Sequence, residues 1–326
     1  MTDILQITPY LPPAVSGVGD HANIIEKKLI DNGWTIESIS TESIKKNRSG
    51  TFSFGNGKEK TEALLEQMYK KPHQTILLHY VCYGFHKYGV PFWLIRALKK
   101  FTKDPRNRLI TFYHELYAFG PPHRSEFWLS LIQRNLIKRV FKYSSAHITN
   151  CHKYQKQLLL WNPKAEIKLA FVFSNIGEPS NIGPKKQGSC AIFGSPGRRR
   201  RIYRNLEPYL KSLKKLGVDK FIDIGNPLPE NELSKFRHLI ETTGFVTPQK
   251  ASEILSAAEF GLAYYNPDEV QKSGIFAAYL AHDTKIINLT EQNTFGDLSL
   301  HQEEYESRSI SHTISTVEEA LSEIKL

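Results

Sequence analysis

"ILQITPYLPPAVSGVGDHANIIEKKL", residues 4–29, is the stretch from which the fold can be predicted. Its first five residues form an apolar run that is typical of a buried strand, and residues 22–32 form an amphipathic run that is typical of a helix. Between them, the letters GVGDHA at residues 17–22 have the G-x-G-x-x-G/A spacing of a dinucleotide-binding turn. A glycine loop between a strand and a helix can bind an anion through backbone N–H groups at the helix N-terminus.

Prolines separate this strand from the glycines. Pro9, Pro12 and Pro13 hold the chain extended before Gly17, whereas a dinucleotide site needs its first glycine directly at the end of the strand. A dehydrogenase that binds NAD here is therefore disfavoured, although it stays an alternative. Gly17 and Gly19 either bring backbone N–H groups to an anion or only supply the positive φ angles of a turn.

The whole chain has 326 residues, a formal net charge of +10 and 40% hydrophobic residues. This length suits two α/β domains, each with its own core. The excess of cations suggests an anionic partner, whether nucleic acid, a membrane surface or a phosphate-bearing substrate. A basic surface that only maintains solubility explains the charge equally well.

No membrane span and no secretory signal are expected from the sequence. The three cysteines, Cys82, Cys151 and Cys190, are scattered without a C-x-x-C pair. A disulfide framework or a zinc site is therefore not expected, and a reducing cytoplasm fits this pattern.

Short apolar runs alternate with amphipathic runs, which predicts an α/β fold made of parallel βαβ units. In the first half we expect strands at residues 4–8, 75–80, 108–114, 146–149 and 167–173. We expect helices at residues 22–32, 61–70, 92–101, 127–143 and 152–160. Residues 174–189 are rich in glycine, proline and polar side chains, and they are typical of an interdomain linker.

The alternation restarts after this linker. We expect strands at residues 190–194, 220–225, 259–265 and 284–289, and helices at residues 203–216, 230–241, 248–257, 274–281 and 317–325. The sequence therefore predicts two domains, residues 1–175 and residues 186–326, with the last helix packing back on the first domain. Ligands of such open sheets bind at the carboxyl ends of the strands.

One expected strand ends at His114, within the stretch YHELYAFGPP. A histidine at the carboxyl end of a strand can donate a hydrogen bond to a phosphate, a sugar hydroxyl or a developing oxyanion. A buried structural histidine is the alternative.

Cationic stretches follow two strands of the second half. FGSPGRRRRIYRN, residues 193–205, carries four consecutive arginines, and arginine forms bidentate contacts with phosphate. A solvated charge run or a nucleic-acid patch would have the same composition. Further along, Lys272, Ser273 and Gly274 open a helix whose N–H groups suit a diphosphate, although an ordinary helix cap explains them too. Glu269 precedes them and can accept hydrogen bonds from sugar hydroxyls.

Together these stretches resemble the glycosyltransferases with a GT-B fold, family 4 type, which are retaining nucleotide-sugar transferases. LPPAVSGVGDHANIIEKKL is similar to the family's N-terminal glycine loop and helix, and YHELYAFGPP to the stretch that carries its strand-end histidine. FGSPGRRRRIYRN is similar to its G-R-x4-K phosphate grip, and TGFVTPQKASEILSAAEFGLAYY to its nucleotide-base region. The resemblance implies two Rossmann-like domains that face each other across a cleft.

The resemblance also implies site residues. Gly17 and Gly19 would lie near the donor diphosphate or the acceptor, and His114 beside the transferred sugar. Arg199 and Arg204 would hold the diphosphate, with Arg204 where the family usually has lysine. The other implied residues are Phe245 and Val246 at the base, Lys272, Ser273 and Gly274 at the diphosphate, and Glu269 as a catalytic residue with His114.

One departure from the family concerns its E-x7-E motif. The eighth residue after Glu269 is Ala277, so the second glutamate is missing. This favours, as an alternative function, a non-catalytic glycosyltransferase-like scaffold that binds the donor without turnover or does not bind it at all.

The activity that the resemblance implies is transfer of a sugar from a nucleotide-diphosphate donor, with a UDP-sugar favoured, to a hydroxyl of a glycan or lipid-linked acceptor. The reaction would retain the anomeric configuration and serve polysaccharide biosynthesis. Arg199, Arg204 and Lys272 would stabilise the departing charge, and the chain has no paired-acid D-x-D motif. Neither a metal nor a cofactor is therefore expected.

The expected acceptor side is basic. Residues 124–161 hold many Lys and Arg residues and one acid, and Arg134, Lys138 and Lys142 recur at i, i+4 and i+8. A basic amphipathic helix can dock on anionic lipid, although a solvated face of a core-packed helix is the alternative. We therefore expect a cytoplasmic protein, peripheral on the inner face of the membrane. Nucleic acid is not an expected partner, because the aromatic and basic interleaving of a single-strand platform is missing.

Overall fold

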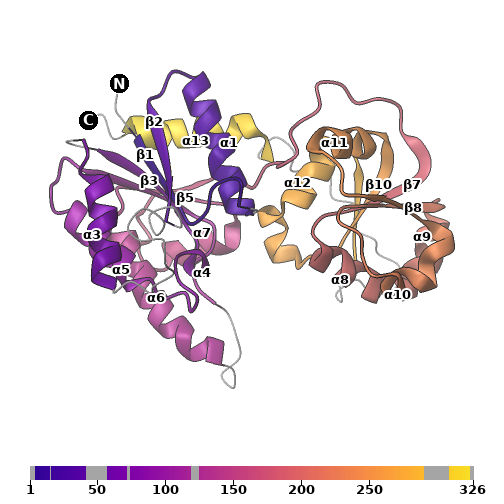
Figure 1. The fold of residues 1–326 in the computed structure, drawn as a ribbon, viewed down its shortest axis with the longest axis horizontal. Helices are drawn as coiled ribbons and strands as arrows, with labels where there is room; N and C mark the ends of the chain where they lie inside the picture. The colour runs from indigo at the N-terminus through magenta and orange to yellow at the C-terminus, as the bar shows by residue number, and fades with distance from the viewer. Residues whose placement is uncertain are drawn as a thin grey trace. The chain divides into compact units, whose positions relative to one another are not determined.

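A computed structural model of the protein describes residues 4–14, 16–41, 57–71, 74–118, 125–289 and 308–323. The chain divides into two compact units (Figure 1). Unit 1 consists of Met1–Phe171 and Thr313–Leu326, and unit 2 consists of Val172–His312. Each unit is built around its own parallel sheet, so the predicted α/β fold class is confirmed.

The sheet of unit 1 has six strands in the order β2-β1-β3-β4-β5-β6, and every neighbouring pair is parallel. The strands are β1 (Ile4–Thr8), β2 (Ile36–Ser40), β3 (Thr75–Tyr80), β4 (Arg108–Tyr113), β5 (Ala146–Thr149) and β6 (Ile167–Leu169). Strands β1 and β3 are buried along their whole length, as expected for central strands that helices cover on both faces.

The helices of unit 1 alternate with these strands. They are α1 (Gly17–Asp31), α3 (Gly57–Met68), α4 (Cys82–Phe85), α5 (Phe92–Phe101), α6 (Ser125–Tyr143) and α7 (His152–Leu159). The C-terminal helix α13 (Ile310–Ser322, yellow in Figure 1) belongs to this unit from Thr313 onward. The Trp34 Nε1–H after α1 donates to Glu318 of α13 at 2.9 Å, which joins the two ends of the unit.

The sheet of unit 2 has five parallel strands in the order β11-β10-β7-β8-β9. The strands are β7 (Lys186–Phe193), β8 (Lys220–Ile224), β9 (Ile240–Gly244), β10 (Ala258–Ala263) and β11 (Lys285–Asn288). The helices are α8 (Pro196–Leu206), α9 (Leu210–Lys215), α10 (Glu230–Leu233), α11 (Pro248–Ala257) and α12 (Gly274–Ala281), with 3-10 turns at Glu207–Tyr209, Ser234–Leu239 and Pro267–Lys272.

Two strands of the sheets differ from the sequence-based expectation. No strand was expected at β2 or at β9, and the helix expected at residues 230–241 overlaps the first two residues of β9. Both are edge strands that are only partly buried, so neither has the continuous apolar pattern of the central strands. The helix expected at residues 203–216 also begins earlier, at Pro196, because proline is favoured in the first turn of a helix.

Each sheet has one point at which the chain changes direction across the strand order. In unit 1 this switch point lies between β1 and β3, and in unit 2 it lies between β7 and β10. In open parallel sheets the carboxyl ends of such a strand pair leave a crevice in which ligands bind. The two switch points are therefore the places at which to look for a functional site.

Candidate functional site

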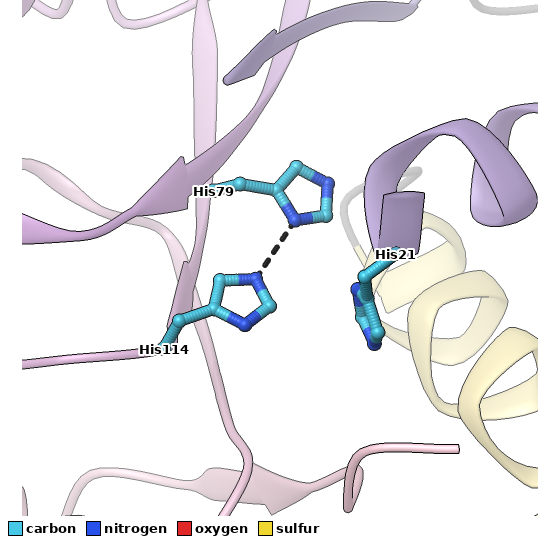
Figure 2. Close-up of side chains that lie close together, drawn as sticks. All are labelled: His21, His79 and His114. Carbon is cyan, nitrogen blue, oxygen red and sulfur yellow. Dashed lines mark hydrogen bonds between the residues drawn. The ribbon is translucent and has the colours of Figure 1, made fainter. Parts of the chain in front are cut away.

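Four polar side chains meet at the switch point of unit 1. Gln6 lies on β1, His79 near the end of β3, His114 directly after β4, and His21 on α1. All four are at most 4% exposed. Figure 2 shows the ring of His21 approaching from α1 toward the rings of His79 and His114.

Hydrogen bonds connect Gln6, His79 and His114 into a chain. Nδ1 of His79 lies 2.9 Å from Nε2 of His114, and Nε2 of His79 lies 2.9 Å from Oε1 of Gln6 (Figure 2 shows the first bond). The amide nitrogen of Gln6 donates to the backbone carbonyl of Ala22 at 3.0 Å and to Ser38 Oγ at 2.7 Å. Of this chain, only His114 could be predicted from the sequence, because the pairing of β1 with β3 is a tertiary property.

The surroundings of His21 and His79 keep these two imidazole rings neutral. Phe112 stacks on His114 with ring centroids 4.5 Å apart, and the His21 ring meets the His114 ring edge-on at 5.0 Å. Burial lowers the pKa of His21 to about 3. Burial, and then the neighbouring His21, also hold the pKa of His79 well below its usual value. At physiological pH the rings of His21 and His79 are therefore uncharged.

The three histidines are also the one group of candidate metal ligands within the part of the chain that the structure describes, with ligand atoms up to 4.8 Å apart. Zinc binds imidazole nitrogen at about 2.0–2.1 Å, so two of its ligands lie at most about 4.2 Å apart, and about 3.3 Å apart in a tetrahedral site. Nδ1 of His79 and Nε2 of His114 lie 2.9 Å apart, which is closer than two ligands of a tetrahedral zinc site, and they are hydrogen-bonded to each other. This arrangement fits a hydrogen-bonded chain better than a metal site.

The glycine loop ends in a capped helix beside this cluster. The hydroxyl of Ser16 accepts a hydrogen bond from the backbone N–H of Gly19 at 3.3 Å, and α1 begins at Gly17. A Cβ on Gly19 would lie 2.7 Å from the backbone oxygen of Tyr10, whereas Gly17 has open space beside it. Neither glycine has a positive φ, so the alternative that they serve only such a turn is wrong. Gly19 allows close packing, and Gly17 leaves the helix N-terminus accessible.

Two helix N-termini meet at the switch point of unit 2. Helix α8 follows β7 with Ser195 as its N-cap, and α12 follows β10 with Ser273 as its N-cap. A Cβ on Gly194 would lie 2.5 Å from Cδ1 of Ile275, so the starts of the two helices are close together. Gly194 has a φ of +131°, a conformation that glycine alone adopts without strain. The two helix dipoles therefore favour an anion at this edge.

The structure does not support the predicted contact between Arg199 of α8 and a phosphate. Arg199 is fully buried, and its guanidinium donates to Asp223, to the backbone oxygen of Asn226 and, at 3.0 Å, to that of Gly194. Tyr203 donates to the other carboxylate oxygen of Asp223 at 2.7 Å. Arg199 is thus part of the core of unit 2, and in this structure it is not accessible to a phosphate.

The neighbouring arginines are the accessible ones. Arg198 is exposed and lies over the ring of Tyr265 at 4.5 Å, and Arg201 is exposed and lies over the ring of Tyr264 at 4.8 Å. Both tyrosines directly follow β10, so these two cations lie at the β7–β10 switch point. Neither cation forms an ion pair with any residue that the structure describes. Neither arginine was among the predicted phosphate ligands. The apolar spacing of Ile202, Tyr203 and Leu206 with position 199 is the sequence signal that distinguishes the inward-facing arginine of this helix.

The other predicted donor residues lie at the carboxyl ends of the strands of unit 2. Ser273 is buried and caps α12 by accepting from the Phe276 N–H at 3.2 Å. Glu269 and Lys272 lie in the 3-10 turn before Ser273, and Gly274 begins α12. Arg204 is exposed on α8, two turns beyond its start. Ala277, where a second glutamate is missing, is buried in α12.

The predicted base region lies between β9 and α11. Phe245 is 77% exposed, an unusual state for a phenylalanine side chain, and Val246 is half-buried beside it. They follow Gly244 at the carboxyl end of β9, on the same edge of the sheet as the starts of α8 and α12. Their contact with a nucleotide base stays a prediction.

A basic surface covers α5 and α6 of unit 1. Between the two helices lies a groove of about 630 Å³, and its lining includes the cations Arg96, Lys99, Arg139 and Lys142 but no acid. The remaining lining residues are Phe92, Ile95 and Tyr143. Three apolar side chains are exposed on the first half of α6, namely Trp128, Leu131 and Ile132. The predicted cations Arg134 and Lys138 are exposed on the same helix. Within the described residues, no helix is both long enough and apolar enough to cross a membrane.

The whole chain is similar in structure to several solved glycosyltransferases. An alpha-glucosyltransferase (AGT) in complex with UDP matches with a TM-score of 0.53 at 11% identity, over 100% of this chain and 91% of that one. Sucrose-phosphate synthase from Thermosynechococcus elongatus matches with a TM-score of 0.57 at 11% identity, over 99% and 90%. AviGT4, a glycosyltransferase of Avilamycin A biosynthesis, matches with a TM-score of 0.54 at 8% identity, over 100% and 97%.

No family model and no curated protein matches the sequence. Identities of 8–11% show a shared fold and not a shared activity. The two parallel α/β units, matched along their full length by these enzymes, give the chain the GT-B fold that its sequence resemblance implied.

Proposed function

We propose that this protein is a glycosyltransferase that uses a nucleotide-diphosphate sugar, with a UDP-sugar favoured, and retains the anomeric configuration. The observation that carries the proposal is the β7–β10 switch point of unit 2. Two helix N-termini and two exposed arginines, Arg198 and Arg201, lie together there. A pyrophosphate needs positive potential of this kind. The fold supports the proposal, since a structure of similar fold holds UDP.

In this proposal the protein stabilises the leaving group with its own charges. The bond from the sugar to the diphosphate breaks, and negative charge develops on the departing phosphate oxygen. Arg198, Arg201 and Lys272, with the starts of α8 and α12, supply positive potential there. This arrangement requires no metal at the diphosphate and no cofactor. Gly17 and Gly19 keep their proposed place near the diphosphate or the acceptor.

The nucleoside would extend from this point along the edge of the sheet. Phe245 offers an exposed aromatic face for the base, with Val246 beside it. Glu269 would accept hydrogen bonds from sugar hydroxyls, and His114 would bind a hydroxyl of the transferred sugar. Arg204 would add positive charge farther along α8. Ser273 and Gly274 would form the N-terminus of α12, whose backbone N–H groups would face the diphosphate.

Nucleotide binding is the first measurement. UDP or a UDP-sugar at one hundred times its Kd is expected to add about 2.7 kcal/mol to the free energy of unfolding, because it binds only the folded state. The panel for thermal denaturation includes UDP, GDP, ADP, their sugar conjugates and NAD. Stabilisation by one nucleotide base should be lost in Arg198→Ala and kept in Lys211→Ala, which removes an exposed cation of α9.

The alternatives make different predictions in the same panel. Stabilisation by NAD alone would indicate an oxidoreductase. Binding of a nucleotide sugar without turnover would indicate the non-catalytic scaffold that Ala277 suggests. An absence of any shift at millimolar ligand would contradict the transferase proposal.

We further propose that the acceptor is a lipid-linked glycan of polysaccharide biosynthesis, and that the protein acts in the cytoplasm at the inner face of the membrane. The basic surface of α5 and α6 supports this. Its groove holds four cations, and exposed tryptophan, leucine and isoleucine side chains lie on α6. Apolar anchors beside cations are typical of helices that lie in an anionic membrane interface.

Vesicle binding tests this acceptor side. The protein is expected to bind phosphatidylglycerol vesicles and not phosphatidylcholine vesicles. Lys138→Glu with Lys142→Glu should weaken binding at least about tenfold, since each cation near an anionic surface contributes about 1 kcal/mol. The matched control is Lys27→Glu with Lys164→Glu, which makes the same charge change at exposed sites of unit 1.

Equal binding by the two double variants would contradict a specific membrane surface. A 13-mer DNA belongs in the same experiment, because one alpha-glucosyltransferase of similar fold was solved in complex with UDP and a 13-mer DNA containing a HMU base. Binding to DNA that requires Lys138 and Lys142, without vesicle binding, would contradict the expectation that nucleic acid is not a partner.

A further inference from the structure

Strands β7 and β10 stop pairing before either strand ends. The last residues that pair between them are Ala191 and Gly261, although β7 continues to Phe193 and β10 to Ala263. The parallel ladder therefore stops short of the carboxyl ends of both strands. Backbone groups beyond this point need other hydrogen-bond partners, because a buried N–H or C=O group without one is costly.

One tyrosine hydroxyl on α12 supplies such partners. The backbone N–H of Phe193 donates to the hydroxyl oxygen of Tyr279 at 3.0 Å. The hydroxyl itself lies 3.0 Å from the carbonyl oxygen of Ala191 on β7 and 3.1 Å from that of Leu262 on β10. Burial raises the pKa of Tyr279 well above its usual value, so the hydroxyl keeps the proton that these two carbonyls share. The hydroxyl thus joins the two strands where their own ladder has ended.

Strand β10 has a glycine where the ring of Tyr279 packs against it. Tyr279 is fully buried, and a Cβ on Gly261 would lie 2.6–2.7 Å from three carbons of its ring. Any other residue at position 261 would therefore displace the ring. Glycine weakens the interior of a strand, and it is found there where another group must approach closely. Gly261 and Tyr279 are thus a fitted pair at the β7–β10 switch point.

The same hydroxyl is bonded to the elements that form the proposed diphosphate site. Phe193 is the last residue of β7, and α8 begins shortly after it. Leu262 lies near the end of β10, two residues before Tyr264, whose ring carries Arg201. Tyr279 itself belongs to α12, the second helix whose N-terminus lies at this edge. One side chain therefore fixes β7, β10 and α12 relative to one another.

We propose that Tyr279 is a positioning residue whose hydroxyl holds the ends of β7 and β10 at a fixed spacing and so shapes the anion-binding crevice between the starts of α8 and α12. The inference rests on the proposed function for its ligand, a nucleoside diphosphate. Without the hydroxyl, the Phe193 N–H and the Leu262 carbonyl lose a partner that the ended ladder does not replace. The strand ends then loosen, and the two helix starts lose the spacing that a diphosphate requires.

Tyr279→Phe tests the hydroxyl, because it keeps the ring. The Kd of UDP, measured by calorimetry well below the unfolding temperature, is expected to rise about tenfold, the equivalent of one hydrogen bond. The matched control is Thr284→Val, which removes a buried hydroxyl that donates to the Leu255 carbonyl at 2.9 Å. Thr284 directly precedes β11, at the opposite edge of the same sheet. An unchanged Kd in Tyr279→Phe, or an equal rise in Thr284→Val, overturns the proposal.

A second variant reaches the same hydroxyl from the strand. In Gly261→Ala the added methyl group meets the ring of Tyr279 and displaces its hydroxyl. The Kd of UDP is expected to rise by a similar factor, and the double variant with Tyr279→Phe should bind no more weakly than the weaker single variant. Effects that multiply in the double variant would show that the two residues act separately, and they would overturn the fitted pair.

Hydrogen exchange reports on the strand ends without any ligand. In Tyr279→Phe the backbone amide of Phe193 loses its acceptor, so its exchange is expected to be at least about tenfold faster. The amides of β8 in the same variant should change less, and Thr284→Val should leave the Phe193 amide as it is. Equal exchange of the Phe193 amide in Tyr279→Phe and in the unaltered protein overturns the role of the hydroxyl.

Failure of the proposed function has a different signature. If the unaltered protein binds neither UDP nor inorganic pyrophosphate, the proposed function fails, and the exchange of the Phe193 amide alone decides whether Tyr279 holds the strands. If transfer is observed, Tyr279→Phe is expected to raise the KM of the sugar donor about tenfold and to leave the KM of the acceptor unchanged. A change in the acceptor KM alone overturns the assignment of Tyr279 to the diphosphate site.

Discussion

Arg199→Ala is expected to lower the free energy of unfolding of unit 2 by about 3–5 kcal/mol. The substitution leaves the carboxylate of Asp223, which is 1% exposed, with Tyr203 as its remaining side-chain donor. It also removes the donors to the backbone oxygens of Gly194 and Asn226. A buried charge that loses its partner is among the most destabilising changes known for a single side chain.

The measurement must report on unit 2 alone. All four tryptophans of the chain lie in unit 1, so tryptophan fluorescence would not detect this change. Hydrogen exchange of β8 amides in rising urea follows the strand that carries Asp223. The control is Arg204→Ala on the same helix, where the exposed side chain is expected to contribute less than about 0.5 kcal/mol.

This experiment also decides between two roles for Arg199. The sequence resemblance places Arg199 on the donor diphosphate, and the structure places it inside the core of unit 2. If Arg199→Ala unfolds at the same urea concentration as the unaltered protein but no longer binds nucleotide, the core assignment is wrong. If it unfolds early and Arg198→Ala alone loses nucleotide binding without loss of stability, the phosphate contact belongs to Arg198.

The strands of the fold could be predicted from the sequence where they are buried along their whole length. Central strands such as β1 and β3 are buried throughout, so they appear in the sequence as short apolar runs. The edge strands β2 and β9 are half-exposed and were missed, since part of each strand meets solvent. For β9, the pairing with β8 makes residues 240–244 a strand, and this pairing is not visible in the sequence.

The site could be predicted only in part, for a related reason. His114 was found because it follows a strand, where ligand-binding residues gather. Gln6 and His79 lie inside apolar strands, and their partners depend on the pairing of β1 with β3 and of β3 with β4. Strand order is a tertiary property that one sequence does not contain. For Arg199, in contrast, the helical spacing with Tyr203 is visible in the sequence and indicates that this arginine faces the core.

Acid is expected to destabilise unit 1 steeply between pH 7 and pH 5, because buried histidines must stay neutral in the folded chain. Burial lowers the pKa of His21 to about 3 and that of His147 to about 4. Above pH 6.5 neither the folded nor the unfolded chain protonates these rings, so they add no pH dependence there. Below pH 6.5 the unfolded chain binds protons that the folded chain does not, and the free energy of unfolding falls with pH.

The size of this loss of stability follows from the number of protons that the unfolded chain binds and the folded chain does not. Each such histidine lowers the free energy of unfolding by about 1.4 kcal/mol per pH unit below its unfolded pKa, which gives about 2 kcal/mol at pH 5. His21 and His147 together account for about 4 kcal/mol on this basis, and His79, whose pKa is also lowered by burial, acts in the same direction. Urea unfolding followed by tryptophan fluorescence measures this in unit 1, where all four tryptophans lie.

A variant separates the histidines from the carboxylates that also titrate in acid. His21→Phe keeps an aromatic ring beside Phe112 and His79 but cannot bind a proton, so its loss of stability from pH 7 to pH 5 should be smaller by about 2 kcal/mol. His152→Gln, at an exposed histidine of α7, should keep the full loss. Equal losses in His21→Phe and the unaltered protein would show that His21 titrates freely in the folded chain. A protonated His21 would place a positive charge beside the His79 ring, and the hydrogen-bonded chain of Gln6, His79 and His114 would then have to rearrange.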